Sequence, residues 1–214
     1  MTLQMEITKK QIIWIILFFG SLIGLNETLI GSIHIQYKSV ILSAITLSLF
    51  AFARYLLPHT GTTLLVMVIA VLYKLTCLGV SFCKPTMVIL LGLGFELFAN
   101  IFIRKQKHSY ISFVLTSVLS SIVTFFGFAF FETFIVKNEY WGPEKFNDYI
   151  FVKAPLTALA STLLTLLGVF IIKILNPEFV DSILKKPILT QIILGLFVFS
   201  IWVVGFVSMQ YKFN

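Results

Sequence analysis

Residues 187–209 read PILTQIILGLFVFSIWVVGFVSM, and none of these side chains carries a charge. A helix needs about 20 mostly apolar residues to cross the roughly 30 Å hydrocarbon core of a bilayer. The stretch is therefore long enough and apolar enough to span a membrane as one helix.

Six more stretches of the same kind precede it. Together the seven candidate spans are approximately Gln11–Ile30, Ser39–Leu57, Thr62–Val80, Pro85–Ile103, Ser109–Val136, Val152–Leu175 and Pro187–Met209. A β-barrel would show shorter segments of alternating polarity, which do not occur in this sequence. We therefore predict an all-α fold, a polytopic membrane helix bundle of about seven transmembrane helices, with residues 1–214 forming a single integral membrane domain.

The composition excludes an ordinary soluble domain. Hydrophobic residues make up 58% of the chain and charged residues only 12%, with a mean hydropathy of +1.00. A soluble domain has about a quarter of its residues charged. The lipid bilayer is thus the first partner that the sequence implies, and any chemistry has to take place within the bundle or at its faces.

Lysines and arginines between the spans predict the orientation, because short cytoplasmic loops are enriched in both. With a cytoplasmic N terminus, nine of them fall inside and six outside, and Arg104-Lys105-Gln106-Lys107 is the clearest contribution. Arg54, one of the nine, is expected to snorkel to the cytoplasmic surface. We expect a multi-pass protein of the cell (inner or cytoplasmic) membrane, with its N terminus inside. The net charge of +7 then reflects basic residues beside anionic headgroups, and no nucleic-acid partner is expected.

Four ionisable residues lie inside or at the edge of different spans: Glu27, Lys74, Glu96 and Glu132. Such residues are costly in hydrocarbon and usually face a cavity, a partner or a transport path. Counting a rise of about 1.5 Å per residue from each span's entry, we expect all four between the midplane and the outer face. Glu96 is expected nearest to the midplane.

Three carboxylates against one ammonium leave an excess of negative charge. We therefore predict one outward-facing acidic pocket in which these four residues bind substrate, with Asn26 as a neutral polar contact. Such a pocket would prefer a cationic or amine-bearing solute, or protons. The alternative is structural: Lys74 pairs with Glu96 or Glu132 to lock helices together, and Glu27 is interfacial.

The longest polar segment of the chain, about residues 137–153, is predicted to be the outer loop. Its aromatic side chains suit the headgroup level of a membrane, or else form a lid that closes over a ligand. Gly142-Pro143 would form the turn of such a lid. Trp141 is the substrate contact that we expect above the acidic pocket.

Gly20 and Gly24 form a Gly-x-x-x-Gly pair, which puts two missing side chains on one face of the first span. The resulting groove permits close approach of another helix, either within the bundle or from a partner subunit. The two glycines are therefore candidate partner-contact residues, expected to face protein rather than lipid.

No enzyme is expected. The sequence holds no Walker-type phosphate loop, no His-Glu-x-x-His metal motif and no Gly-x-Ser-x-Gly elbow. Its histidines, His34, His59 and His108, fall in loops rather than at helical spacing inside spans. We therefore expect no catalytic residue, no metal and no cofactor.

A longer pattern runs from Gly24 to Leu97. Asn26-Glu27 ends the first span, and Ala53-Arg-Tyr-Leu-Leu-Pro-His-Thr-Gly-Thr-Thr-Leu-Leu65 enters the third, which contains Lys74. Pro85-Thr-Met then opens the fourth span, which contains Glu96, and Ala154-Pro-Leu-Thr-Ala158 begins the sixth. This pattern resembles the small substrate-binding S components of energy-coupling-factor (ECF) transporters for vitamins and metals.

The resemblance implies an outward-opening binding pocket in a compact helical bundle, which works with a membrane scaffold subunit and two cytoplasmic ATPase subunits. It also implies that small residues of the first helix contact the scaffold, which Gly20 and Gly24 would do here. Two features depart from the family. The chain has seven spans in place of the usual six, with 187–209 as an extra C-terminal helix, and glycines replace the usual alanines.

The favoured function is the membrane-embedded substrate-binding subunit of an uptake transporter for a vitamin-like or cationic small molecule. The alternatives are a stand-alone proton-coupled carrier or channel, and a membrane assembly or scaffold protein. A carrier would show paired repeats and broken helices at matching positions, which are not evident. A scaffold would not need buried carboxylates.

Overall fold

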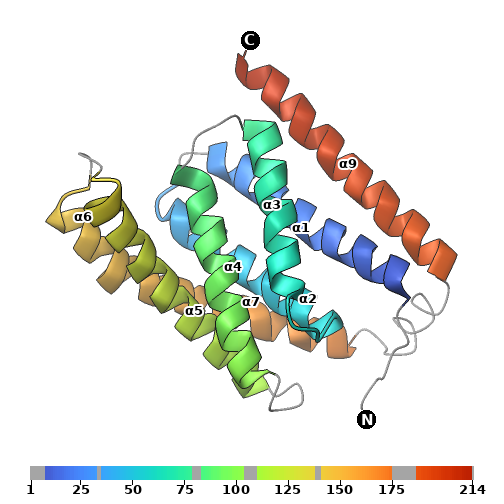
Figure 1. Cartoon of the computed structure of the whole chain (residues 1–214), viewed down its shortest axis with the longest axis horizontal. Coiled ribbons are helices and arrows are strands. Elements are labelled where there is room, and N and C mark those ends of the chain that lie inside the picture. Colours follow the sequence, from blue (N-terminus) through green and yellow to red (C-terminus); the bar gives the residue numbers. More distant parts are fainter. Residues whose placement is uncertain are drawn as a thin grey trace.

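The computed structural model describes residues 8–32, 35–78, 83–103, 110–137, 141–174 and 187–213. All regular structure in these ranges is helical, and the molecule is a bundle of long helices (Figure 1), which confirms the predicted fold class. In chain order the elements are α1 (Lys9–Ser32), α2 (Lys38–Leu56), α3 (Thr62–Leu78), α4 (Cys83–Phe102), α5 (Tyr110–Phe130), the π-helical η1 (Phe131–Ile135), α6 (Pro143–Asn147), the π-helical η2 (Asp148–Lys153), α7 (Ala154–Ile174) and α9 (Pro187–Phe213).

Six stretches of these helices are long and apolar enough to cross a membrane. They comprise α1, α2, α4, α5 with η1, α6 with η2 and α7, and α9. The remaining long helix, α3, has a shorter apolar run, Thr62–Thr76, and packs against both α1 and α4. The chain is therefore a multi-pass membrane helix bundle with one helix for each of the seven predicted spans.

The helices α1 and α9 run in the same direction. The ring of Phe18 lies 6.1 Å from that of Phe197, and further along both helices Trp202 donates a hydrogen bond to Ser21. Figure 1 shows the first residues of both helices at one end of the bundle, which we call the near end. Because successive long helices alternate in direction, α2 ends and α3 begins at the near end. The helix α3 ends and α4 begins at the opposite, far end.

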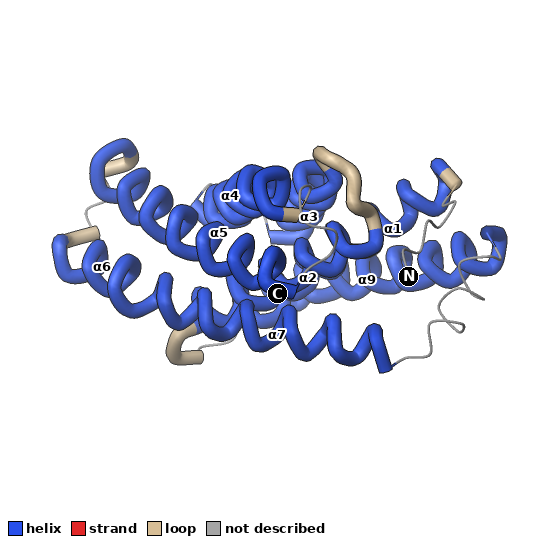
Figure 2. The backbone as a smooth tube through the Cα atoms, turned by 90° about the horizontal axis from the view of Figure 1, so that it is seen from below, coloured by secondary structure: helices blue, strands red, loops and turns tan. Residues whose placement is uncertain are grey.

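The structure corrects the predicted outer loop over residues 137–153. A helix begins at Pro143, directly after extended backbone at Gly142, and continues through α6, η2 and α7. Figure 2 shows these elements as one unbroken helix. Proline suits the first helical position, where its missing N–H would have had no partner in the helix. Residues 138–140 lie outside the described ranges, as does the basic run at 104–107, and the orientation in the membrane stays a prediction.

The glycine pair of α1 packs against α3 of the same chain. A Cβ atom added at Gly20 would lie 2.5 Å from Cβ of Ile69 and 2.8 Å from the carbonyl oxygen of Val66. At Gly24 it would lie 2.5 Å from Cδ1 of Tyr73. The sequence allowed two arrangements for this glycine pair, packing within the bundle or contact with a partner subunit, and the structure shows packing within the bundle. The prediction of contact with a partner subunit is wrong, because α3 covers this face.

The C-terminal helix α9 is held by two polar contacts as well as by packing. The hydroxyl of Tyr73 on α3 donates to the carbonyl oxygen of Ile201 at 2.8 Å, and the indole of Trp202 donates to Ser21 on α1 at 2.9 Å. Many apolar side chains of α9 are exposed, which suits contact with lipid tails. The additional helix is therefore an integral part of the bundle.

Alanine at Gly20 or Gly24 is expected to destabilise the protein by about 1–3 kcal/mol, the usual range for overpacking a tight core. Thermal unfolding in detergent measures the effect. Gly127→Ala on α5 is the matched control, because a Cβ at that position meets nothing within 4 Å. Equal unfolding temperatures for the three variants would show that α1 and α3 are not in tight contact.

Candidate functional site

Two of the predicted site residues meet at the far end of the bundle. Nζ of Lys74 on α3 lies 2.8 Å from Oε2 of Glu27 on α1, and both side chains are at least nine-tenths buried. The close contact of Gly24 with Tyr73 explains this pairing. Glu27 stands almost one turn after Gly24 and Lys74 directly follows Tyr73, so the glycine contact sets the register that brings the two charges together.

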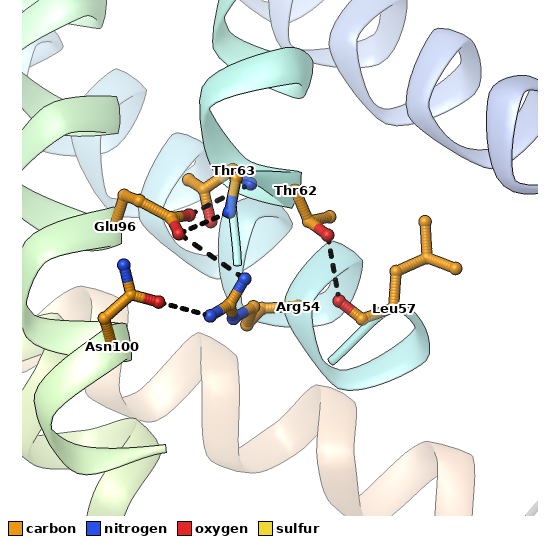
Figure 3. A network of polar contacts seen from close by, with 7 residues as sticks. Arg54, Leu57, Thr62, Thr63, Glu96 and Asn100 are labelled. Atoms are coloured by element: carbon orange, nitrogen blue, oxygen red, sulfur yellow. Dashed lines mark hydrogen bonds and ion pairs between the residues drawn. The ribbon is translucent and has the colours of Figure 1, made fainter. Parts of the chain in front are cut away.

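Glu96 belongs to a different polar junction, at the near end (Figure 3). Its Oε1 lies 3.5 Å from Nη1 of Arg54, which comes from the last turn of α2. Nη2 of Arg54 donates to Oδ1 of Asn100 at 2.6 Å. Asn100 follows Glu96 by one turn of α4, so both side chains lie on one face of that helix.

The carboxylate of Glu96 also caps the start of α3. The backbone N–H of Gly61 donates to Oε1 at 2.7 Å, and that of Thr63 donates to Oε2 at 3.2 Å. The first N–H groups of a helix have no partner within the helix, and the positive end of its dipole favours an anion. Gly61 adopts a φ of +89°, which other residues rarely do, so glycine fits this turn. Glu96 therefore joins α2, α3 and α4 at the point where the chain turns.

This junction overturns the predicted placement of Glu96 in a pocket shared with Lys74. Lys74 stands eleven residues beyond Thr63 on α3, which corresponds to about 16 Å along the helix axis. Glu96 thus lies at the near end, whereas the Lys74 pair lies at the far end. The prediction that Arg54 snorkels is also wrong, because its side chain is only 2% exposed and is held by Glu96 and Asn100.

Glu132 lies at the far end, on the π-helical turn η1, and only 1% of it is exposed. Its neighbour Phe131 lines a cavity that is also lined by Leu75, the neighbour of Lys74. Three of the four predicted charged residues are therefore brought to one end of the bundle. Turns of π-helix are rare and occur frequently at functional sites.

The cavity between α3, α4 and the segment after α5 has a volume of about 450 Å³. That volume falls within the range of small-molecule sites. The lining is apolar apart from one threonine, and it comprises Val71, Leu75, Pro85, Thr86, Ile89, Phe131 and Val136. The prediction of a cavity walled by carboxylates is therefore wrong for this one, although two buried charged residues, Lys74 and Glu132, directly neighbour the lining residues Leu75 and Phe131 in the sequence.

The two neutral residues predicted for the site, Asn26 and Trp141, have different neighbours from each other. Asn26 directly precedes Glu27, and its buried Nδ2 has no hydrogen-bond partner within the described part of the chain. Trp141 packs its ring 4.5 Å from that of Tyr149 and 5.6 Å from that of Phe128. It therefore belongs to an aromatic cluster that joins the last turns of α5 to η2.

Sequence reasoning missed Asn100 and did not foresee the junction around Glu96. One signal was present, because Asn100 follows Glu96 at a spacing that shares a helix face. Another was Gly61 directly before two threonines, a pattern typical of a helix start whose free N–H groups attract a carboxylate. No comparable signal indicates which apolar residues line the cavity.

Comparison with known protein families, characterised proteins and solved structures gives no match for this chain. Its function is therefore inferred from its own residues and their arrangement.

Glu96→Gln is expected to lower the free energy of unfolding by about 3–5 kcal/mol, because it leaves the buried guanidinium of Arg54 without its anion. Denaturant unfolding in detergent measures the loss. Glu144→Gln is the control, since Glu144 is exposed on α6. The double variant Arg54→Met/Glu96→Gln should lose less than Glu96→Gln alone. Unchanged stability of Glu96→Gln would contradict the structural role that we assign to this carboxylate.

Proposed function

We propose that the protein is the membrane-embedded substrate-binding subunit of a small-molecule uptake transporter. The observation that carries the proposal is the far-end cavity, because a ligand-sized apolar space lies at the end of the bundle that also holds Lys74 and Glu132, the buried sequence neighbours of its lining residues Leu75 and Phe131. Buried ionisable groups in a membrane bundle are costly and mark substrate or ion sites by default. A π-helical turn at the same place adds to this support.

The cavity and its surroundings favour a solute with an apolar body and an amine. Apolar walls bind the body by excluding it from water. Among the residues whose burial the structure describes, the buried charges at this end are two carboxylates, Glu27 and Glu132, and one ammonium, Lys74. Their sum favours a positively charged group on the solute. This class includes the vitamin-like and cationic solutes expected from the sequence.

The partners in this proposal follow from the resemblance to ECF transporters. A substrate-binding subunit of that kind takes up its solute together with a membrane scaffold subunit and cytoplasmic ATPase subunits. The N terminus and the near end would then face the cytoplasm, and the far-end cavity would face outward. Glu96 and Arg54 would lie on the cytoplasmic side and hold the bundle together without touching the solute.

Purification from its native membranes in mild detergent tests the partner assignment. We expect ATP-hydrolysing subunits and a second membrane protein to co-purify with the tagged chain, at levels above those captured by an unrelated tagged membrane protein. A chain that purifies alone and transports solute by itself in lipid vesicles would favour a stand-alone carrier. A chain that captures a membrane complex without ATPases would favour an assembly or scaffold role.

Filling the cavity is expected to abolish ligand binding with little effect on folding. Ile89→Trp places a large ring among the lining residues, whereas Leu97→Trp, the matched control, changes a position of α4 that is 56% exposed. A thermal-shift screen against small amine-bearing compounds and their neutral analogues measures binding. Compounds that stabilise the unaltered protein should stabilise Leu97→Trp equally and Ile89→Trp not at all. Equal stabilisation of both variants would place the binding site elsewhere.

Glu132→Gln extends the same screen to the buried charge that directly follows the lining residue Phe131. We expect it to weaken binding of amine-bearing compounds by about tenfold or more, equivalent to about 1.4 kcal/mol, while neutral analogues keep their affinity. Equal losses for both classes of compound would assign Glu132 a structural role only.

A further inference from the structure

The π-helical turn η1 forms one wall of the far-end cavity. The backbone N–H of Val136 donates to the carbonyl oxygen of Phe131 at 2.9 Å, and both residues line the cavity. This hydrogen bond joins residues five positions apart, whereas the bonds of an α-helix join residues four positions apart. The two ends of one π-helical bond therefore each supply a side chain to the same wall.

The extra residue in this turn decides which side chains face the cavity. An α-helix turns by about 100° per residue, so a residue five positions after Phe131 would lie about 140° away from it. The π-helical bond takes up one more residue in the turn and brings Val136 back to the side of Phe131. Ile135, which would form this bond in an α-helix, is 63% exposed and does not line the cavity.

Aromatic contacts outside the cavity hold η1 in its π-helical form. Such turns are rare, so the surrounding structure has to favour them over the α-helix. The ring of Phe134, which lies within η1, is 4.9 Å from that of Phe130 and 6.2 Å from that of Phe146 on α6. Tightening η1 to an α-helix would turn Phe134 relative to Phe146. The π-helical form therefore depends on contact with a neighbouring helix.

The position of η1 at the end of a helix allows its winding to change without rotating a whole helix. A π-helical turn inside a helix can tighten only if all the later turns rotate with it. In contrast, η1 ends at Ile135, and Lys137 has a φ of +51°, which an α-helix does not accommodate. The next helix, α6, begins at Pro143. A change of winding at η1 is therefore local.

We propose that η1 changes between a π-helical and an α-helical register, and that this change controls ligand binding in the far-end cavity. In the π-helical register Val136 lines a cavity of ligand size. In the α-helical register Ile135 would bond to Phe131 and replace Val136 on the wall with a larger side chain. A ligand meets different walls in the two registers, which is the condition for it to shift their populations. The inference rests on the proposed function, because that function assigns the ligand to this cavity.

Deletion of Ile135 tests the control of binding. It leaves Val136 four residues after Phe131, so an ordinary α-helical bond would keep Val136 on the wall. A protein that is only partly in its binding-competent state binds more weakly by that fraction, so the deletion should tighten binding of the stabilising amine-bearing compounds by about threefold or more. Ile135→Leu is the control, which keeps both the residue count and the size of the side chain. Unchanged or weaker binding by the folded deletion variant would overturn the proposal.

Crosslinking of paired cysteines tests the two registers without any ligand and without the deletion. Leu75 lines the cavity from α3, so Leu75→Cys is combined with either Val136→Cys or Ile135→Cys, in a chain whose Cys77 and Cys83 are replaced by serine. A short bifunctional thiol reagent should crosslink both pairs, because each residue faces Leu75 in one of the registers. Leu75→Cys with Ile111→Cys is the control pair, since Ile111 lies in the first turn of α5 and is 66% exposed.

The results separate the two proposals. Crosslinking at position 135 no faster than in the control pair would overturn the register change, even if compounds bind in the cavity. Failure of every amine-bearing compound to stabilise the unaltered protein would instead count against the proposed function and, with it, against control of binding by η1. Crosslinking at both positions, together with tighter binding by the deletion variant, would support both.

Discussion

The close contact between α1 and α3 is the interaction on which much of the remaining arrangement depends. Two glycines let the backbones approach so closely that a single added methyl group would meet α3. In lipid, where apolar surface gives little drive for helices to associate, such packing supplies much of the attraction. The contact also fixes a register, and from that register follow the ion pair of Glu27 with Lys74 and the position of Tyr73 against α9.

Four of the buried charged residues that the structure describes form two ion pairs, one at each end of the bundle. Each pair joins helices that are distant in sequence: Arg54 with Glu96, and Glu27 with Lys74. Removing one partner of a buried ion pair costs more free energy than forming the pair gains. Such pairs therefore act mainly by disfavouring arrangements in which their helices are misplaced. The two pairs together leave the space between α3, α4 and η1 to apolar side chains.

The fold class and the seven helices follow from the sequence because the bilayer imposes one rule, a long apolar run for each crossing. The candidate site could be predicted only in part. Counting residues from the start of each span correctly placed Lys74 and Glu132 at the same end of the bundle. It wrongly placed Glu96 there too, because such a count depends on an assumed residue at which each helix enters the membrane. Which charged residues form ion pairs depends on the register between helices. Gly24 sets the register of α1 against α3 because it has no Cβ atom and so lets Tyr73 come close. The helical start at Pro143 was hidden because polar residues at a membrane surface suit a loop and a helix equally well.

The two contacts of α9 bear on how the protein is made. Chains are synthesised from the N terminus, so α1 to α7 enter the membrane before α9 exists. The ion pairs, the cavity lining and the glycine contact all lie within those earlier helices. The hydroxyl of Ser21 and the carbonyl-bound hydroxyl of Tyr73, in contrast, gain their bonds to α9 only when the last helix arrives. Both polar partners of α9 are therefore already in the membrane when this last helix is made, and their two hydrogen bonds can form only as α9 docks onto α1 and α3.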